Sequence, residues 1–274
     1  MKWTLAAACL VLAGQAAAAS PPQRIMSLKI CTDELLLDLV PPSSGKKSRI
    51  ASVTFLSREA AGLKYWPQAA AIPINHGSAE EILATHPDLI LTDPFMAPSL
   101  RPLLAKTGAK IIEVPPAENF DQIRAVTRMV AKAVGEEARG EALIAQMDSD
   151  LRALAAHRPR KMLTVAGWGT GGYVPGTGGL FDAMLMAAGA RNVERGAFGY
   201  YDVESLIAAN PDALVYGDTY SGTTSLRADQ DLHPALLKRY AGRRVSYASL
   251  YGCGVPRSAA ITRQLQDALL KVKQ

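Results

Sequence analysis

Apolar segments of two lengths alternate along most of this 274-residue chain. Short runs rich in Ile, Val and Leu predict buried strands, and longer stretches with apolar positions three and four residues apart predict amphipathic helices. Strands that alternate with helices over short connections favour a parallel sheet covered by helices, so we expect an α/β fold. The predicted strands are 24–30, 49–55, 88–93, 110–114, 161–167, 212–218 and 243–250. The predicted helices beside them are 32–40 with a Thr32 cap, 102–108, 180–189 and 257–272.

The middle of the chain contains no predicted strand. Asn119 can cap a first helix, and Gly135 stands where a glycine would end it. A second helix over 136–157 has one apolar face and would extend roughly 33 Å. That face consists of Leu143, Met147, Leu151 and Leu154. We therefore predict two similar lobes with mostly parallel sheets, residues 20–118 and 159–274, joined by a long helical spine over residues 119–158.

One twelve-residue pattern occurs twice, as EEILATHPDLIL at 80–91 and ESLIAANPDALV at 204–215. Each copy reads as the end of a helix, a Pro-Asp break and a strand. The copies share Glu80/Glu204, Ala84/Ala208, Pro87/Pro211 and Asp88/Asp212. A separation of 124 residues is too long for a solenoid repeat, so we interpret the pattern as one equivalent unit in each lobe. The alternative is that Pro-Asp simply begins strands in many α/β proteins.

The first residues are set apart from the fold. Lys2, an apolar run over 5–13 and Ala17–Ala19 are typical of a cleavable signal peptide, which we place at residues 1–19. Its removal takes one cation from the 30 Lys and Arg, leaving 29 against 25 Asp and Glu. This small excess is dispersed, so no nucleic-acid surface is expected. Nothing downstream holds about 18 consecutive apolar residues, and we expect an exported, soluble protein.

Catalytic motifs are weak in this sequence. GWGTGG at 167–172 fits G-x-G-x-x-G, but no helix follows it directly, so no nucleotide site is predicted. G-x-S-x-G and H-E-x-x-H do not occur. We predict no catalytic residue, cofactor or resident metal. An enzyme would depend on the acids Asp33, Asp93 and Asp218, and a soft-metal site would use His76, Cys31 and Cys253.

Aromatic residues concentrate in the connections between predicted elements. They are Phe55, Tyr65, Trp66, Phe95, Trp168, Tyr173, Phe198, Tyr200, Tyr201, Tyr220 and Tyr251. Ordinary loop packing explains any one of them. As a set, aromatics at strand ends suit a concave site for a large, partly apolar ligand. Open α/β sheets bind ligands at the carboxyl ends of their strands, which is where we expect this site.

Three segments resemble a known family: RIMSLKICTDELLLDL (24–39), GSAEEILATHPDLILTD (77–93) and YDVESLIAANPDALVYGD (201–218). With the spine, they are similar to the periplasmic substrate-binding proteins (class III) of ABC importers for cobalamin, iron-siderophores and haem. The resemblance implies a monomeric, bilobed periplasmic protein with a rigid interdomain helix. It would capture a bulky metal chelate, a corrinoid, ferric siderophore or haem, and deliver it to a permease dimer. The alternatives are a periplasmic carrier for an apolar molecule such as a lipid, or a metal-ion-binding or enzymatic relative.

The resemblance also implies roles for individual residues. Glu80 and Glu204, one on each lobe, would dock onto permease arginines. The expected ligand contacts, from the resemblance and the aromatic connections, are Cys31, Thr32, Phe55, Leu56, Trp66, Asn75, His76, Trp168, Tyr173, Tyr251 and Arg257. The cobalamin binder carries a Trp just before its first docking helix, where this chain has Asn75 and His76, which argues against cobalamin.

Cys31 and Cys253 are expected on the cleft side of opposite lobes. A disulfide would link the lobes and requires α-carbons within about 7 Å. Free thiols would instead be candidate ligand contacts. We favour the disulfide.

Overall fold

The first lobe is built on a five-stranded parallel sheet. The structure is a computed structural model that describes residues 20–41, 48–96, 98–217, 233–248 and 252–272. The strands are β1 (Ile25–Ser27), β2 (Ile50–Thr54), β3 (Ile74–Asn75), β4 (Leu89–Thr92) and β5 (Lys110–Glu113), in the order β3-β2-β1-β4-β5. All four pairings are parallel, as the alternating pattern predicted. The helices are α1 (Ile30–Leu39), α2 (Ala60–Tyr65), α3 (Ala79–Thr85) and α4 (Arg101–Lys106).

The second lobe repeats this plan with four parallel strands. They are β6 (Leu163–Gly167), β8 (Ala190–Asn192), β10 (Ala213–Gly217) and β11 (Arg244–Tyr247), in the order β11-β10-β6-β8. An antiparallel pair, β7 (Tyr173–Pro175) and β9 (Phe198–Tyr200), follows β6. The glycine-rich segment after β6 therefore leads into this pair and does not open a nucleotide-binding helix. The helices are α7 (Leu180–Ala187), α8 (Val203–Ala209), α9 (Pro234–Arg239) and α10 (Ser258–Leu269).

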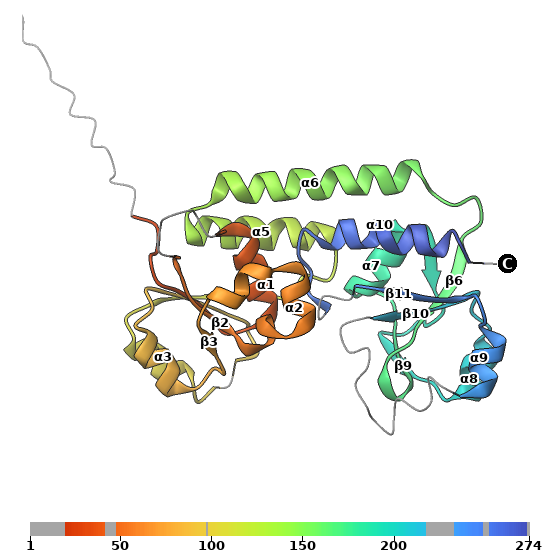
Figure 1. Ribbon diagram of the computed structural model, residues 1–274, viewed down its shortest axis with the longest axis horizontal. Coiled ribbons are helices and arrows are strands. Elements are labelled where there is room, and N and C mark those ends of the chain that lie inside the picture. Colours follow the sequence, from red (N-terminus) through yellow and green to blue (C-terminus); the bar gives the residue numbers. More distant parts are fainter. Residues whose placement is uncertain (1–19, 42–47, 97, 218–232, 249–251, 273–274) are drawn as a thin grey trace, which may run out of the picture.

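Two long helices connect the lobes, α5 (Phe120–Val134) and α6 (Glu137–Ala156). Asn119 caps α5, with its side-chain oxygen accepting a bond from the Gln122 N–H at 2.9 Å, and Gly135 ends it at φ 71°. Both features were predicted from sequence. In Figure 1 the lobes lie side by side, and α6 runs along one side of both with α5 and α10 beneath it.

The repeated pattern forms the same unit in each lobe. Helices α3 and α8 both have seven residues and a side-chain cap, supplied by Ser78 and Asp202. Both end at a left-handed residue, His86 at φ 45° and Asn210 at φ 49°. Asn and His are both enriched among the non-glycine residues that adopt this conformation. The strands that follow, β4 and β10, occupy equivalent positions beside β1 and β6.

The shared aspartates explain why Pro-Asp recurs. The Asp88 carboxylate accepts bonds from the backbone N–H groups of Gln23 (2.6 Å) and Arg24 (3.0 Å), just before β1. The Asp212 carboxylate accepts one from the Thr164 N–H (2.8 Å) in β6. Each aspartate thus ties the start of a lobe's central strand to the strand that follows the repeated helix.

The chain returns to the first lobe just before its last helix. Cys253, Val255 and Ile261 belong to the same buried cluster as the apolar side chains of α1 and α5. A disulfide joins Cys31 of α1 to Cys253, with a Cα–Cα distance of 5.1 Å. Arg263 on α10 forms an ion pair with Asp150 on α6 at 2.8 Å. The lobes are therefore connected by a covalent bond and by packing, in addition to the spine.

Helix α1 begins earlier than predicted. Its N-cap is Lys29, so Cys31 lies in the first turn and not in a loop. Thr32 is not the cap. Its hydroxyl donates to the Lys29 carbonyl at 2.8 Å from inside the helix.

We predict that the double variant Cys31→Ser/Cys253→Ser has a lower free energy of unfolding, by about 2–5 kcal/mol. The bond spans 222 residues of sequence, so its loss leaves the unfolded chain much freer. Urea unfolding followed by circular dichroism measures the difference. Wild-type protein with its disulfide reduced should match the variant. Equal stability of variant and oxidised wild type would contradict the linkage.

Candidate ligand-binding site

The first group of exposed candidate residues lies where β2 and β3 end. Phe55 follows β2 and His76 follows β3, and parallel strands bring their carboxyl ends to one edge of the sheet. The two rings stack, with centroids 5.2 Å apart and planes at 17°. The Phe55 side chain is 41% exposed. Two residues predicted separately as ligand contacts therefore form one surface.

Glu81 on α3 holds the loop that carries His76. One carboxylate oxygen lies 3.1 Å from His76 Nδ1, and the other accepts bonds from the N–H groups of His76 (2.9 Å) and Ser78 (3.0 Å). The side-chain bond to His76 and these backbone bonds lower the pKa of Glu81 to about 2. The carboxylate is thus charged at any pH where the protein is expected to work, and it fixes one side of the imidazole.

Four predicted ligand contacts are buried. Thr32, Trp66, Asn75 and Trp168 are each 3% exposed or less. Asn75 donates to the Ser52 hydroxyl at 2.7 Å and to two backbone carbonyls, so it fastens β1, β2 and β3 together at their carboxyl ends. In this structure these side chains support the edge of the sheet from within. Leu56 is half-buried and Tyr251 lies outside the described residues.

Arg257, another predicted contact, reaches from the segment before α10 to the first lobe. Its guanidinium lies 3.1 Å from Asp38 Oδ1 and 5.1 Å from the Trp66 ring. The Trp66 indole N–H donates to the same Asp38 oxygen at 2.8 Å. The Arg257 side chain therefore contributes to the joint between the lobes, next to the disulfide.

Helix α1 carries two further acids inside the protein. Burial raises the pKa of Asp33 to about 7, although Thr54 and Ser57 donate to one of its oxygens. Burial, with the neighbouring Asp33 and Asp38 charges, raises the pKa of Glu34 to about 9, while Arg257 acts in the opposite direction. Neither Glu34 oxygen has a hydrogen-bond partner among the described residues.

Of the three acids considered for an enzyme, the structure describes Asp33 and Asp93. Asp33 is fully buried. Asp93 pairs with Lys29 at 3.3 Å. Asp218 lies outside the described part of the chain.

The second lobe presents an exposed aromatic group. Tyr173 of β7 and Phe198 and Tyr200 of β9 have ring centroids 5.9 to 6.1 Å from one another. Their exposed fractions are 39%, 56% and 71%. The pair of strands follows the carboxyl end of β6, so this group, which we call the aromatic triad, lies beyond the ligand-binding edge expected for this sheet. Only Tyr173 was predicted as a ligand contact, because two three-residue strands give too short a pattern to recognise.

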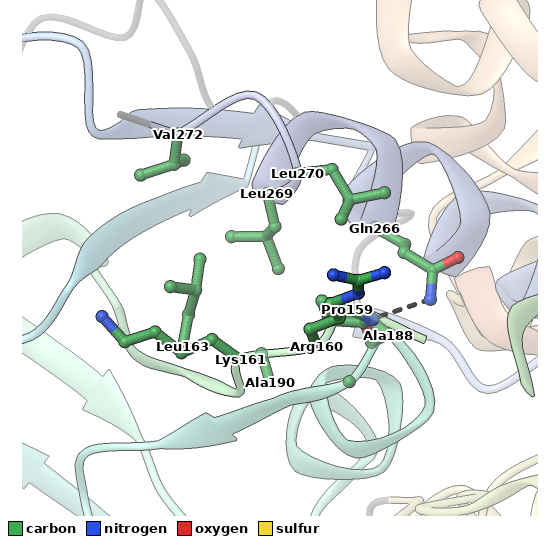
Figure 2. Close-up of a pocket in the computed structure, with 11 residues that line it drawn as sticks. Pro159, Arg160, Lys161, Leu163, Ala188, Ala190, Gln266, Leu269, Leu270 and Val272 are labelled. Carbon is green, nitrogen blue, oxygen red and sulfur yellow. Dashed lines mark hydrogen bonds between the residues drawn. The ribbon is translucent and has the colours of Figure 1, made fainter. Parts of the chain in front are cut away.

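A cavity of about 220 Å³ lies elsewhere in the second lobe (Figure 2). It is bordered by Leu163 and Ala190, the first residues of β6 and β8, and by Leu269 at the end of α10. Figure 2 shows Leu163 and Leu269 projecting into it, and Gln266 bonded to the Ala188 carbonyl beside it. The cavity is therefore at the amino ends of the strands, opposite the candidate site. It is also smaller than the 300–1,000 Å³ common for ligand pockets.

The two glutamates of the repeated pattern are exposed. Glu80 on α3 and Glu204 on α8 have no ion-pair partner among the residues that the structure describes. Figure 1 shows α3 in one lobe and α8 in the other, both away from α6. In each lobe, the helix that carries the exposed glutamate thus lies away from the spine helix α6.

The part of the chain that the structure describes contains neither a metal-binding cluster nor a membrane-spanning helix. Within the described ranges, no group of three or more His, Cys, Asp or Glu side chains could hold a metal ion. None of the helices in those ranges has both the length and the hydropathy needed to cross a bilayer.

A family model described as periplasmic binding protein matches residues 34–233. The uncharacterized ABC transporter substrate-binding lipoprotein YvrC of Bacillus subtilis (strain 168) is 22% identical over 72% of this chain. The match covers 64% of that relative, slightly under two thirds of its length.

Solved structures are similar over nearly the whole chain. The periplasmic haem-binding protein RhuT from Roseiflexus sp. RS-1 has a TM-score of 0.74 at 24% identity, over 92% of this chain and 99% of that one. The periplasmic vitamin B12 binding protein BtuF of Vibrio cholerae has a TM-score of 0.67 at 17% identity, over 93% and 99%. At these identities the likeness establishes the fold.

We predict that Glu34 makes the protein less stable as pH rises. The folded state keeps this proton up to about pH 9, whereas an unfolded Glu releases it near its ordinary pKa of 4.5. The free energy of unfolding should therefore fall between these values, by up to about 1.4 kcal/mol per pH unit for one proton. Glu34→Gln should show a shallower fall in urea unfolding measured from pH 5 to 8.

Glu137→Gln is the matched control, because Glu137 is an exposed acid on α6. It should keep the wild-type pH dependence. The free energy of unfolding of every variant should keep some pH dependence, because Asp33 is present in all of them and its pKa is also raised. Identical slopes for Glu34→Gln and wild type would show that Glu34 is already ionised in the folded protein.

Proposed function

Because the chain belongs to the periplasmic binding protein family, we propose that it captures a bulky organic metal chelate in the periplasm and delivers it to an ABC permease. The observation that carries this proposal is the paired carboxylates of the repeated unit. Glu80 and Glu204 are exposed on equivalent helices of the two lobes, α3 and α8, which both lie away from α6 in Figure 1. A two-fold permease dimer that offers arginines at two matching points would engage both through charge-assisted hydrogen bonds.

The ligand class is supported by the aromatic surfaces. The stacked Phe55 and His76 rings lie at the carboxyl edge of the first sheet, and the aromatic triad follows the central strand of the second. Aromatic faces suit large, flat and partly apolar molecules. Haem and vitamin B12, which the similar solved proteins RhuT and BtuF are named for binding, are both metal macrocycles.

The joint between the lobes favours capture without wide closure. The disulfide, the Arg257–Asp38 pair and the contacts of α10 with α6 would all have to change if the lobes rotated far. The ligand would therefore bind between lobes that are largely preorganised, which reduces the entropic cost of binding. ATP hydrolysis by the transporter would drive release, and the binding protein itself, acting as a monomer, would perform no covalent chemistry.

A periplasmic carrier for an apolar molecule is the second candidate. The observation that favours it is the exposure of Tyr173, Phe198 and Tyr200, since these rings suit a lipid as well as a macrocycle. The paired glutamates have no role in such a carrier, and for this reason we prefer the importer.

We predict that protein purified from its own periplasm carries a coloured ligand. Native mass spectrometry should show an added mass, and the absorption spectrum should show a visible band from a metal chelate. A colourless added mass of lipid size would contradict the chelate and support the carrier. Protein stripped of ligand should regain the band on incubation with the chelate that was identified.

We also predict that Glu80→Arg/Glu204→Arg abolishes ligand uptake and leaves ligand affinity within about twofold of wild type. Reversing both charges replaces attraction to permease arginines by repulsion. Uptake is measured in cells that depend on this protein, and affinity is measured on the purified variant.

Glu137→Arg/Asp267→Arg makes the same change in net charge at exposed positions of α6 and α10. In Figure 1 these helices lie away from α3 and α8, so this control should retain uptake. Normal uptake by the Glu80/Glu204 variant, or an equal loss in the control, would overturn the docking role.

A further inference from the structure

The His76 imidazole is held from one side and open on the other. Its Nδ1 faces Glu81 Oε1 at 3.1 Å, and its side chain is 62% exposed. Among the described residues, Nε2 has no hydrogen-bond partner. The adjacent Phe55 ring stacks against the imidazole at 5.2 Å. The ring is thus oriented by two contacts that leave Nε2 available to a ligand.

This geometry is the one that proteins use for a metal-binding His. A carboxylate that accepts a hydrogen bond from Nδ1–H fixes the tautomer in which Nε2 carries the free lone pair. Glu81 is suited to this role because its second oxygen is held in place by the backbone N–H groups of His76 (2.9 Å) and Ser78 (3.0 Å).

One imidazole is too little for a bare metal ion. Structural zinc takes four protein ligands and catalytic zinc three, and the described residues offer no cluster of three. A metal already held in the plane of a macrocycle is different, because the protein needs to supply only an axial ligand. The metal that His76 fits is therefore one that arrives with its own equatorial ligands.

Building on the proposed function, we propose that His76 Nε2 is an axial ligand to the metal of a planar tetrapyrrole. The Nε2 lone pair would form a bond to the metal and displace an axial water or chloride, with no change in oxidation state. A ferric siderophore that already fills six coordination positions would offer no place for this bond. The class of ligand is thereby narrowed to macrocycles with an exchangeable axial position.

Three probes test which class of metal chelate the protein can coordinate through His76. They are haemin, aquocobalamin and ferric desferrioxamine. Each is titrated into ligand-free protein, with absorption spectra for coordination and tryptophan fluorescence for affinity. Wild type should bind haemin or aquocobalamin with a band shift that marks nitrogen coordination. His76→Ala should lose that shift and bind at least about tenfold more weakly. Added imidazole should restore the band in this variant.

Two further variants separate coordination from structural effects. Glu81→Gln removes the charge and keeps a residue able to complete the Ser78 capping box, and it should weaken binding about tenfold. His86→Asn removes an exposed His from the other end of α3 and installs the residue found at the equivalent position, Asn210, so it should behave as wild type.

The results separate axial ligation by His76 from the capture of a metal chelate. If His76→Ala binds the same macrocycle with an unchanged spectrum, or if wild type binds only ferric desferrioxamine, axial ligation is overturned while chelate capture stands. If wild type binds none of the three probes and carries no chelate from the periplasm, both are overturned.

Discussion

Parallel pairing in the two main sheets is the constraint on which the other features depend. Consecutive parallel strands need a helix or another long connection between them. The carboxyl ends of all the strands therefore lie at one edge of the sheet, and each connection to the next strand begins at that edge. That is why Phe55 and His76, 21 residues apart in sequence, stack on one another. It also explains the recurring Pro-Asp, because Asp88 and Asp212 join the amino end of each central strand to that of its neighbour. The cavity at the amino ends of β6 and β8 belongs to the opposite edge.

The second constraint is the joint at the start of α10. Cys253, Val255, Ala259 and Ile261 pack in the same buried cluster as the apolar side chains of α1 and α5, although the strands before them belong to the second lobe. Arg257 meets Asp38 and Trp66 there, beside the Cys31 disulfide. This joint places charge inside the molecule, and the unpartnered Glu34 is tolerated because its raised pKa keeps it neutral. The covalent bond and the ion pair that fix the lobes relative to each other thus lie at one joint.

The sequence predicted correctly those features that depend on residues close together in the chain. The caps of α5 at Asn119 and Gly135 and the repeated helix–strand unit follow from residue type and spacing. It failed where the outcome depends on tertiary packing. Trp66 and Asn75 read as loop residues facing a ligand, yet bonds to Asp38 and to the neighbouring strands draw both inside. Eight residues of α1, Thr32 to Leu39, are also buried, although three of them are acids.

The two proposals meet on α3. Glu80 is exposed for docking, and the next residue, Glu81, holds His76. A force applied to Glu80 would act on the same seven-residue helix whose first turn orients the imidazole. In α8 the residue after Glu204 is Ser205, which donates its backbone N–H to the Asp202 cap and holds no metal ligand. The lobes are therefore alike in what they would present to a permease and different in what they would present to a ligand. The first property follows from the repeated unit, and the second goes with two differences at equivalent positions, His76 against Tyr200 and Glu81 against Ser205.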